Sequence, residues 1–351
     1  MVGDEVIHRF SLYRLACFPV LVAGISIVIF SQLLPSVVES CSAACTTTDN
    51  PLSQQGCFFS AFWKQLLATE ISSAFVASFL ALVTALLNIS NIEASRVCNQ
   101  PSTILTRPVW IWIAVNAVTG AVVSPTVLIA NIKRHQDHRR QSTGASKRRR
   151  IQERDENRPL INSVSSIPVS TSNSTTIDPS APESHERELV SDSRSYIIPI
   201  SVVLGFIVPS IALVLKPDPL IAGLWNLFPI AIYIIGSLAL KLVPDGQGFR
   251  HAESHWGSSA RLYSIPILLS LSAHVYLVSC WLTTSEEGWA ELPAVKLMVT
   301  NFWTICATYL YWIFIESSPA TAVLTVLTAI LAGPGAGVSI GWVLKEQRMV
   351  L

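Results

Sequence analysis

Residues 297–344 read LMVTNFWTICATYLYWIFIESSPATAVLTVLTAILAGPGAGVSIGWVL, and Glu316 is the only charged side chain in this stretch. A helix needs about 20 mostly apolar residues to cross the hydrocarbon core of a bilayer. The stretch is therefore long enough for two membrane helices, with Glu316-Ser317-Ser318-Pro319 at the turn between them. An acid is expensive inside hydrocarbon, so we expect Glu316 to lie near a membrane face.

The whole chain has the composition of a multi-pass membrane protein. Of its 351 residues, 50% are hydrophobic and only 13% are charged, and the mean hydropathy is +0.48. A soluble domain carries about 25% charged residues. The apolar stretches lack the alternation of barrel strands, so the sequence predicts an all-α transmembrane bundle of about eight spans, with seven as the alternative. The expected spans are about 12–34, 66–87, 109–131, 196–215, 220–243, 262–282, 297–315 and 319–343.

A long polar segment divides these spans into two sets. Residues 1–131 hold three spans and residues 196–351 hold five, whereas segment 132–195 is rich in basic residues and then in Ser, Thr and Pro. It contains Lys147-Arg148-Arg149-Arg150 and has no apolar periodicity, so we expect it to be disordered. A nucleic-acid partner is an alternative reading of the basic cluster. Basic residues beside a span more often mark a cytosolic flank, and we expect no nucleic acid.

The basic segment sets the expected orientation, because Lys and Arg accumulate in cytosolic loops. Eight spans then put both chain ends outside and place Glu70 and Glu316 together at the cytosolic face. Two features disagree with this scheme. Three cysteines, Cys41, Cys45 and Cys57, would lie in the reducing cytosol, although they would suit a lumenal disulfide. The basic residues at the C-terminal end of the chain would also prefer the cytosol.

Three polar residues within the expected spans are candidates for a site. Glu70 is either a proton donor that faces a cavity or an interfacial acid that reaches the headgroups. Asn116 is either a ligand contact or an amide that ties two helices together. His274 is alone on an apolar helix, where a packing role is the commoner explanation. No His or Cys stands at ligand spacing from His274, so we expect no metal site.

Aromatic residues open the span at 220–243. Trp225, Asn226 and Phe228 precede Pro229, which bends a helix. Their rings could stabilise a carbocation, or they could belong to the aromatic belt at a membrane interface. The candidate substrate-binding residues are Asn116, Trp225, Asn226, Phe228 and His274, and the candidate catalytic acids are Glu70 and Glu316.

Several common site motifs are absent from the sequence. It contains no Walker loop, no dinucleotide glycine fingerprint, no HExxH pair, no GxSxG elbow and no DDxxD-type acidic cluster for magnesium. We therefore expect neither a cofactor nor a metal. Chemistry on an apolar substrate would begin with a proton from a buried carboxylic acid.

Two motifs together resemble a known group. Leu224-Trp225-Asn226-Leu227-Phe228-Pro229 and Ala332-Gly333-Pro334-Gly335-Ala336-Gly337 are similar to features of fungal integral membrane terpene cyclases and PaxA-like proteins of indole-diterpene and meroterpenoid clusters. The resemblance implies metal-independent cyclisation of an epoxidised, prenylated precursor at the endoplasmic reticulum membrane. It also implies a hydrophobic prenylated substrate, the lipid bilayer and other pathway enzymes as partners. The small cyclases of this group have about seven spans and are shorter, so this chain differs by its extra span and long basic segment.

Two other classes of function stay open. A transporter or receptor-like protein would bind a small ligand between its helices. A division into three and five spans does not favour an inverted repeat, which counts against a secondary transporter. A non-catalytic scaffold of the same pathway would use the basic segment for docking. Whether Glu70 and Glu316 can reach one cavity separates these hypotheses.

Overall fold

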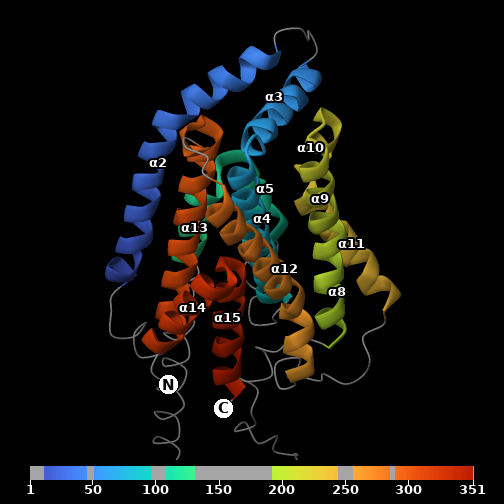
Figure 1. The fold of residues 1–351 in the computed structure, drawn as a ribbon. Helices are drawn as coiled ribbons and strands as arrows, with labels where there is room; N and C mark the ends of the chain where they lie inside the picture. The colour runs from blue at the N-terminus through green and yellow to red at the C-terminus, as the bar shows by residue number, and fades with distance from the viewer. Residues whose placement is uncertain are drawn as a thin grey trace, which may run out of the picture.

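The computed structural model describes residues 12–45, 51–95, 108–130, 192–243, 256–284 and 289–350. The regular structure of these residues is entirely helical, which confirms the predicted all-α bundle (Figure 1). Most of segment 132–195 lies outside the described residues, so its expected disorder stays a prediction. Its last four residues are the exception, because they already belong to helix α8 (Asp192–Val202).

Two hydrogen bonds identify one end of the bundle. The Arg194 guanidinium in α8 donates to the carbonyl of Ser95 at 2.9 Å, so α4 (Glu70–Ser95) ends where α8 begins. The Tyr311 hydroxyl donates to the carbonyl of Leu15 at 2.9 Å, so α13 (Pro293–Glu316) ends where α2 (Leu12–Ser42) begins. We call this the basic end, because the basic segment 132–195 leads into α8, and α8 begins here.

A disulfide marks the opposite end. Cys45, just after α2, is bonded to Cys57 in α3 (Pro51–Leu66). The hydroxyl of Ser60 in α3 donates to the carbonyl of Pro217, which follows α9 (Val208–Leu215). We call this the disulfide end.

Six segments of the described residues, which we call crossings, run between these two ends. Five are helices long and apolar enough to cross a membrane, and the sixth is a pair bent by 57° that passes the same test when its two helices are taken together. The crossings are α2, α4, α8 continued through a π-helical turn (Val203–Ile207) into α9, α10 (Pro219–Trp225) with α11 (Phe228–Leu242), α12 (Trp256–Thr283) and α13.

The remaining two of the eight expected spans are hairpins instead. The span expected at 109–131 breaks at Thr119 into α5 (Pro108–Val118) and the helix Gly120–Ala130. The span expected at 319–343 breaks at Gly333 into α14 (Pro319–Ala332) and α15 (Pro334–Val350). We call them the first and the second hairpin. Each arm is too short to cross about 30 Å of hydrocarbon unless it is extended by another apolar helix.

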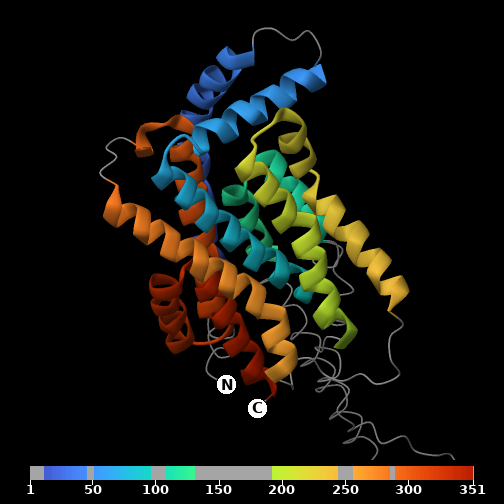
Figure 2. The ribbon, with the colours of Figure 1, turned by 45° about the vertical axis from the view of Figure 1, so that its right-hand side comes forward.

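The second hairpin leaves and returns to the basic end. Lys345, near the end of α15, forms an ion pair with Glu316, the last residue of α13. Between them the hairpin tip reaches half depth, because a Cβ on Gly335 would lie 2.9 Å from the carbonyl oxygen of Ala81, in the middle of α4. Figure 2 shows α14 and α15 (red) confined to the half of the bundle where the chain ends.

The first hairpin behaves in the same way. Because α4 ends beside the start of α8, the chain between them must cross an even number of times. Neither 96–107 nor 131–191 contains an apolar stretch that could cross, so 108–130 enters and returns on one side. A Cβ on Gly120 would lie 2.6 Å from Ile305, in the middle of α13, which places this tip at half depth as well.

The order of elements is therefore repeated along the chain. A crossing away from the basic end, a crossing back and a half-depth hairpin occur first at 12–130, with α3 inserted, and again at 256–350. The tips are exchanged between the two units: the first tip packs on α13 and the second on α4. This repeat is not visible in the sequence. The two hairpins differ in their residues, and one breaks at Thr119 whereas the other breaks at Gly333.

The two hairpins give a second orientation beside the one expected from the sequence. With the six crossings above, the first and the last described residues lie at the basic end, and the Cys45–Cys57 disulfide lies at the other. The eight-span scheme differs because it counts both broken segments as crossings. If the basic end faces the cytosol, the disulfide faces the lumen and the basic C-terminal residues face the cytosol. Both earlier disagreements then disappear.

Candidate functional site

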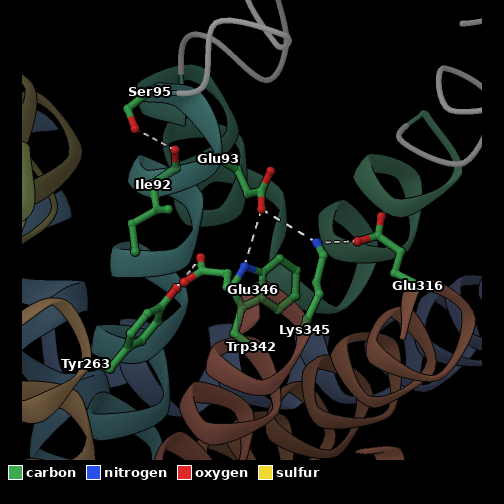
Figure 3. Close-up of polar contacts among 8 residues, drawn as sticks. All are labelled: Ile92, Glu93, Ser95, Tyr263, Glu316, Trp342, Lys345 and Glu346. Atoms are coloured by element: carbon green, nitrogen blue, oxygen red, sulfur yellow. Dashed lines mark hydrogen bonds and ion pairs between the residues drawn. The ribbon is translucent and has the colours of Figure 1, made fainter. Parts of the chain in front are cut away.

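Charged residues from three helices meet at the basic end (Figure 3). Glu93 comes from the last turns of α4, Glu316 ends α13, and Lys345 and Glu346 lie in α15. Helix α15 reaches α4 and α13 because Gly337 and Gly341 have no side chains to keep it away from α14. A Cβ on Gly337 would lie 2.6 Å from the carbonyl oxygen of Thr325.

Lys345 holds the centre of this ionic cluster. Its ammonium pairs with Glu316 and lies 3.6 Å from Oε1 of Glu93. It also lies 4.0 Å above the centre of the Trp342 ring, a cation–π contact. The side chains of Lys345, Glu316 and Glu93 are only 11%, 7% and 15% exposed. These charges are thus largely removed from solvent and depend on one another.

Glu346 is a third buried carboxyl, on the other side of the same helix turn. The residue is 1% exposed, and the hydroxyl of Tyr263 in α12 donates to its Oε1 at 2.8 Å. The indole N–H of Trp342 donates to Oε1 of Glu93 at 3.3 Å. Two carboxyls, those of Glu93 and Glu316, therefore face one ammonium, and the carboxyl of Glu346 bonds to Tyr263 beside them. Charge is expensive to bury, and the ion pairs with Lys345 offset part of that cost.

Only one member of the cluster was predicted as a site residue from the sequence. Glu316 lies at a helix end, as expected, and has Lys345 as a partner. Glu93 was missed because the expected span ended at 87, whereas α4 continues to Ser95. Glu346 was missed because the span expected at 319–343 ended before it. In both cases the helix continues past the end of the apolar run, and this continuation was the only signal in the sequence that could have pointed to Glu93 and Glu346.

Glu70 lies at the opposite end of the bundle. It begins α4 at the disulfide end and is exposed, and the next residue, Ile71, packs against Cys280 near the end of α12. Glu93 is 23 residues further along the same helix, about 35 Å away at 1.5 Å per residue. The expectation that Glu70 and Glu316 share one face is therefore wrong, and the two acids cannot reach one cavity.

Four of the candidate substrate-binding residues are brought together. The Asn116 side-chain amide donates to the carbonyl of Asn226 at 3.0 Å and ties α5 to the bend between α10 and α11. The rings of Trp225 and Phe228 are 5.4 Å apart. They belong to an aromatic cluster whose members pack ring against ring within the bundle: Trp63, Trp112, Phe206, Trp225 and Phe228.

The aromatic cluster approaches the ionic cluster along α4. The indole N–H of Trp112 donates to the hydroxyl of Ser90 at 3.0 Å, and the ring of Trp112 packs on Phe228 at 6.1 Å. Ser90 and Glu93 are three residues apart and share a face of α4. Through Trp112 the aromatic cluster thus reaches Ser90, one helical turn from an acid that the sequence did not single out.

His274 stands apart from both clusters. Its Nε2 lies 2.9 Å from the carbonyl oxygen of Ile330, so it holds the second hairpin near its tip. Among the described residues, no group of three or more His, Cys, Asp and Glu side chains could hold a metal ion.

No protein-family profile, curated protein or solved structure significantly matches this chain. The resemblance of its two motifs to membrane terpene cyclases therefore rests on the motifs alone.

Proposed function

We propose that this chain is an integral membrane terpene cyclase of fungal secondary metabolism, working at the endoplasmic reticulum. It would close the rings of an epoxidised, prenylated precursor by proton-initiated carbocation chemistry, without a metal or cofactor. The observation that carries the proposal is the buried ionic cluster, in which Glu93 and Glu316 face one ammonium beside Trp342. Burial and a neighbouring carboxyl both favour the protonated form of an acid, so one of these two carboxyls would hold a proton until an epoxide oxygen takes it.

Within this proposal the proton donor is Glu93. Its side chain is more exposed than that of Glu316, and it lies one turn from the Ser90–Trp112 contact. A prenyl chain that lies along the aromatic cluster would place its epoxide near this carboxyl, and the rings would shield the cation from water. Glu316 holds Lys345 in place and is a positioning residue.

Conversion of epoxidised, prenylated precursors by microsomes from a heterologous host tests the proposal. We expect Glu93→Gln to lose product formation while the protein level stays the same. Glu70→Gln is the matched control, because the same change falls at the far end of the same helix and should retain activity. Undiminished cyclisation by Glu93→Gln removes this acid from the reaction. If no precursor in a panel gives a product with the wild-type protein, the cyclase proposal fails.

A transporter or receptor-like function is the second candidate, and the two hairpins favour it. Transporters often build their binding sites at half depth from broken helices, between repeated units. Both breaks of this chain lie at half depth, on the central crossings of the opposite unit. Saturable uptake or binding of a pathway intermediate, with no chemical change in it, would favour this candidate over the cyclase.

A further inference from the structure

The tip of the first hairpin has an unusual backbone. Thr119 joins α5 to the helix Gly120–Ala130 with a φ of 125°, and it is the only non-glycine residue of the described ranges with a positive φ. The corresponding residue of the second hairpin is a glycine, Gly333, at φ 90°. A β-branched side chain is strained in this region, and strained residues concentrate at binding and catalytic sites.

Two polar atoms at the same tip are buried without a hydrogen-bond partner among the described residues. They are Oγ1 of Thr119 and Oδ1 of Asn301, a residue in the middle of α13. Both lie beside Gly120, because a Cβ on Gly120 would be 3.3 Å from Oδ1 of Asn301. At this depth in a membrane there is no bulk water to satisfy them, and each buried acceptor without a donor costs free energy.

The second hairpin serves as an internal comparison. Its tip has the same position in the repeated unit, yet the protein itself supplies the donors there. The hydroxyl of Ser270 donates to the carbonyl of Ala332 at 3.3 Å, and His274 lies 2.9 Å from the carbonyl oxygen of Ile330. The protein thus supplies a polar partner to two carbonyls at the second tip, whereas the side-chain oxygens of Thr119 and Asn301 at the first tip have none among the described residues.

We propose that the tip of the first hairpin binds the hydroxyl or amine group of an otherwise apolar small molecule, which donates hydrogen bonds to Thr119 and Asn301. The ligand must be mostly apolar because the tip lies at half depth and Ile305 flanks it. Glycine at 120 lets the tip approach α13 closely, since a Cβ there would lie 2.6 Å from Cδ1 of Ile305. The site stands apart from the ionic cluster at the basic end, so it does not depend on cyclase chemistry.

Binding of a prenyl alcohol tests this site. The probe is radiolabelled geranylgeraniol, and its methyl ether is the matched ligand that cannot donate. Equilibrium dialysis would compare the full-length chain in phosphatidylcholine nanodiscs with empty nanodiscs. We expect saturable binding of the alcohol and about tenfold weaker binding of the ether, the loss typical of removed buried hydrogen bonds.

Variants assign the effect to the tip. Thr119→Val keeps the branched shape and removes only the hydroxyl, and Asn301→Leu removes the amide at similar volume. Each should abolish the preference for the alcohol over the ether. Ser270→Ala at the second tip is the control and should keep that preference. Equal binding of alcohol and ether by the wild-type protein, or an unchanged preference in both variants, would overturn the proposal. The probe carries no epoxide, so a failure here is distinct from a failure of cyclisation.

Discussion

Lys345 in α15 is the ion-pair partner of Glu316, the acid that ends α13. The pair fixes the returning arm of the second hairpin against the crossing that precedes it. Because Lys345 also faces Glu93, one ammonium connects the two units of the repeated order.

Replacing Lys345 with Met should destabilise the protein by about 3 kcal/mol, because it removes the cation that pairs with two largely buried carboxylates. Unfolding of the purified protein in detergent measures this. Lys296→Met removes a similar ion pair with Glu291, but that lysine is 42% exposed and its partner 78%, so stability should hardly change. Adding Glu316→Gln to Lys345→Met should recover part of the loss. Equal stability of the two lysine variants would contradict the burial argument.

Membrane topology distinguishes six crossings from eight. Tags at the N-terminus, at the C-terminus and within 140–150 should all be digested by protease added to the cytosolic side of sealed microsomes. The eight-span scheme instead predicts that both terminal tags are protected while the internal tag is cut. Protection of either terminus would refute the returning hairpins.

The disulfide should stabilise the disulfide end of the bundle. Its two cysteines are 12 residues apart, and closing a loop of this size contributes about 3 kcal/mol. We expect Cys45→Ser with Cys57→Ser to lower the unfolding temperature in detergent, and a reductant to lower that of the wild-type protein to the same value. Cys17→Ser is the control, because this thiol is exposed and free.

Glycine packing holds the second hairpin closed. Gly337→Ala would place a methyl group 2.6 Å from the carbonyl oxygen of Thr325, so we expect a loss of about 1–3 kcal/mol in the free energy of unfolding. Gly223→Ala is the control, since no atom lies within 4 Å of a Cβ there. A destabilisation no larger than that of the control would show that α14 and α15 are not packed as described.

Backbone strain at Thr119 predicts a gain in stability. Thr119→Gly should raise the free energy of unfolding by about 1 kcal/mol, because glycine adopts a φ of 125° without a steric penalty. The same variant should bind geranylgeraniol less tightly, since it removes the hydroxyl of the proposed site. A loss of stability would mean that the residue is not strained.

The sequence by itself determined the membrane class, the helical fold and the ends of the apolar runs. Apolar length alone decides these, because the bilayer has a fixed thickness. It also placed Glu316 at a helix end, and it singled out Asn116, Asn226, Trp225 and Phe228, which lie together.

Only the tertiary structure decided which apolar runs form one continuous helix and which are broken into a hairpin. An apolar run of about 23 residues has the same hydropathy pattern whether it forms one helix or a hairpin. The hairpins differ from a single helix by the break at Thr119 or Gly333 and by the contacts of the tip. That decision reverses the side on which Glu70 lies and assembles the ionic cluster from residues far apart in the chain. Contacts of this kind depend on how the helices pack, which the apolar pattern of one helix does not encode.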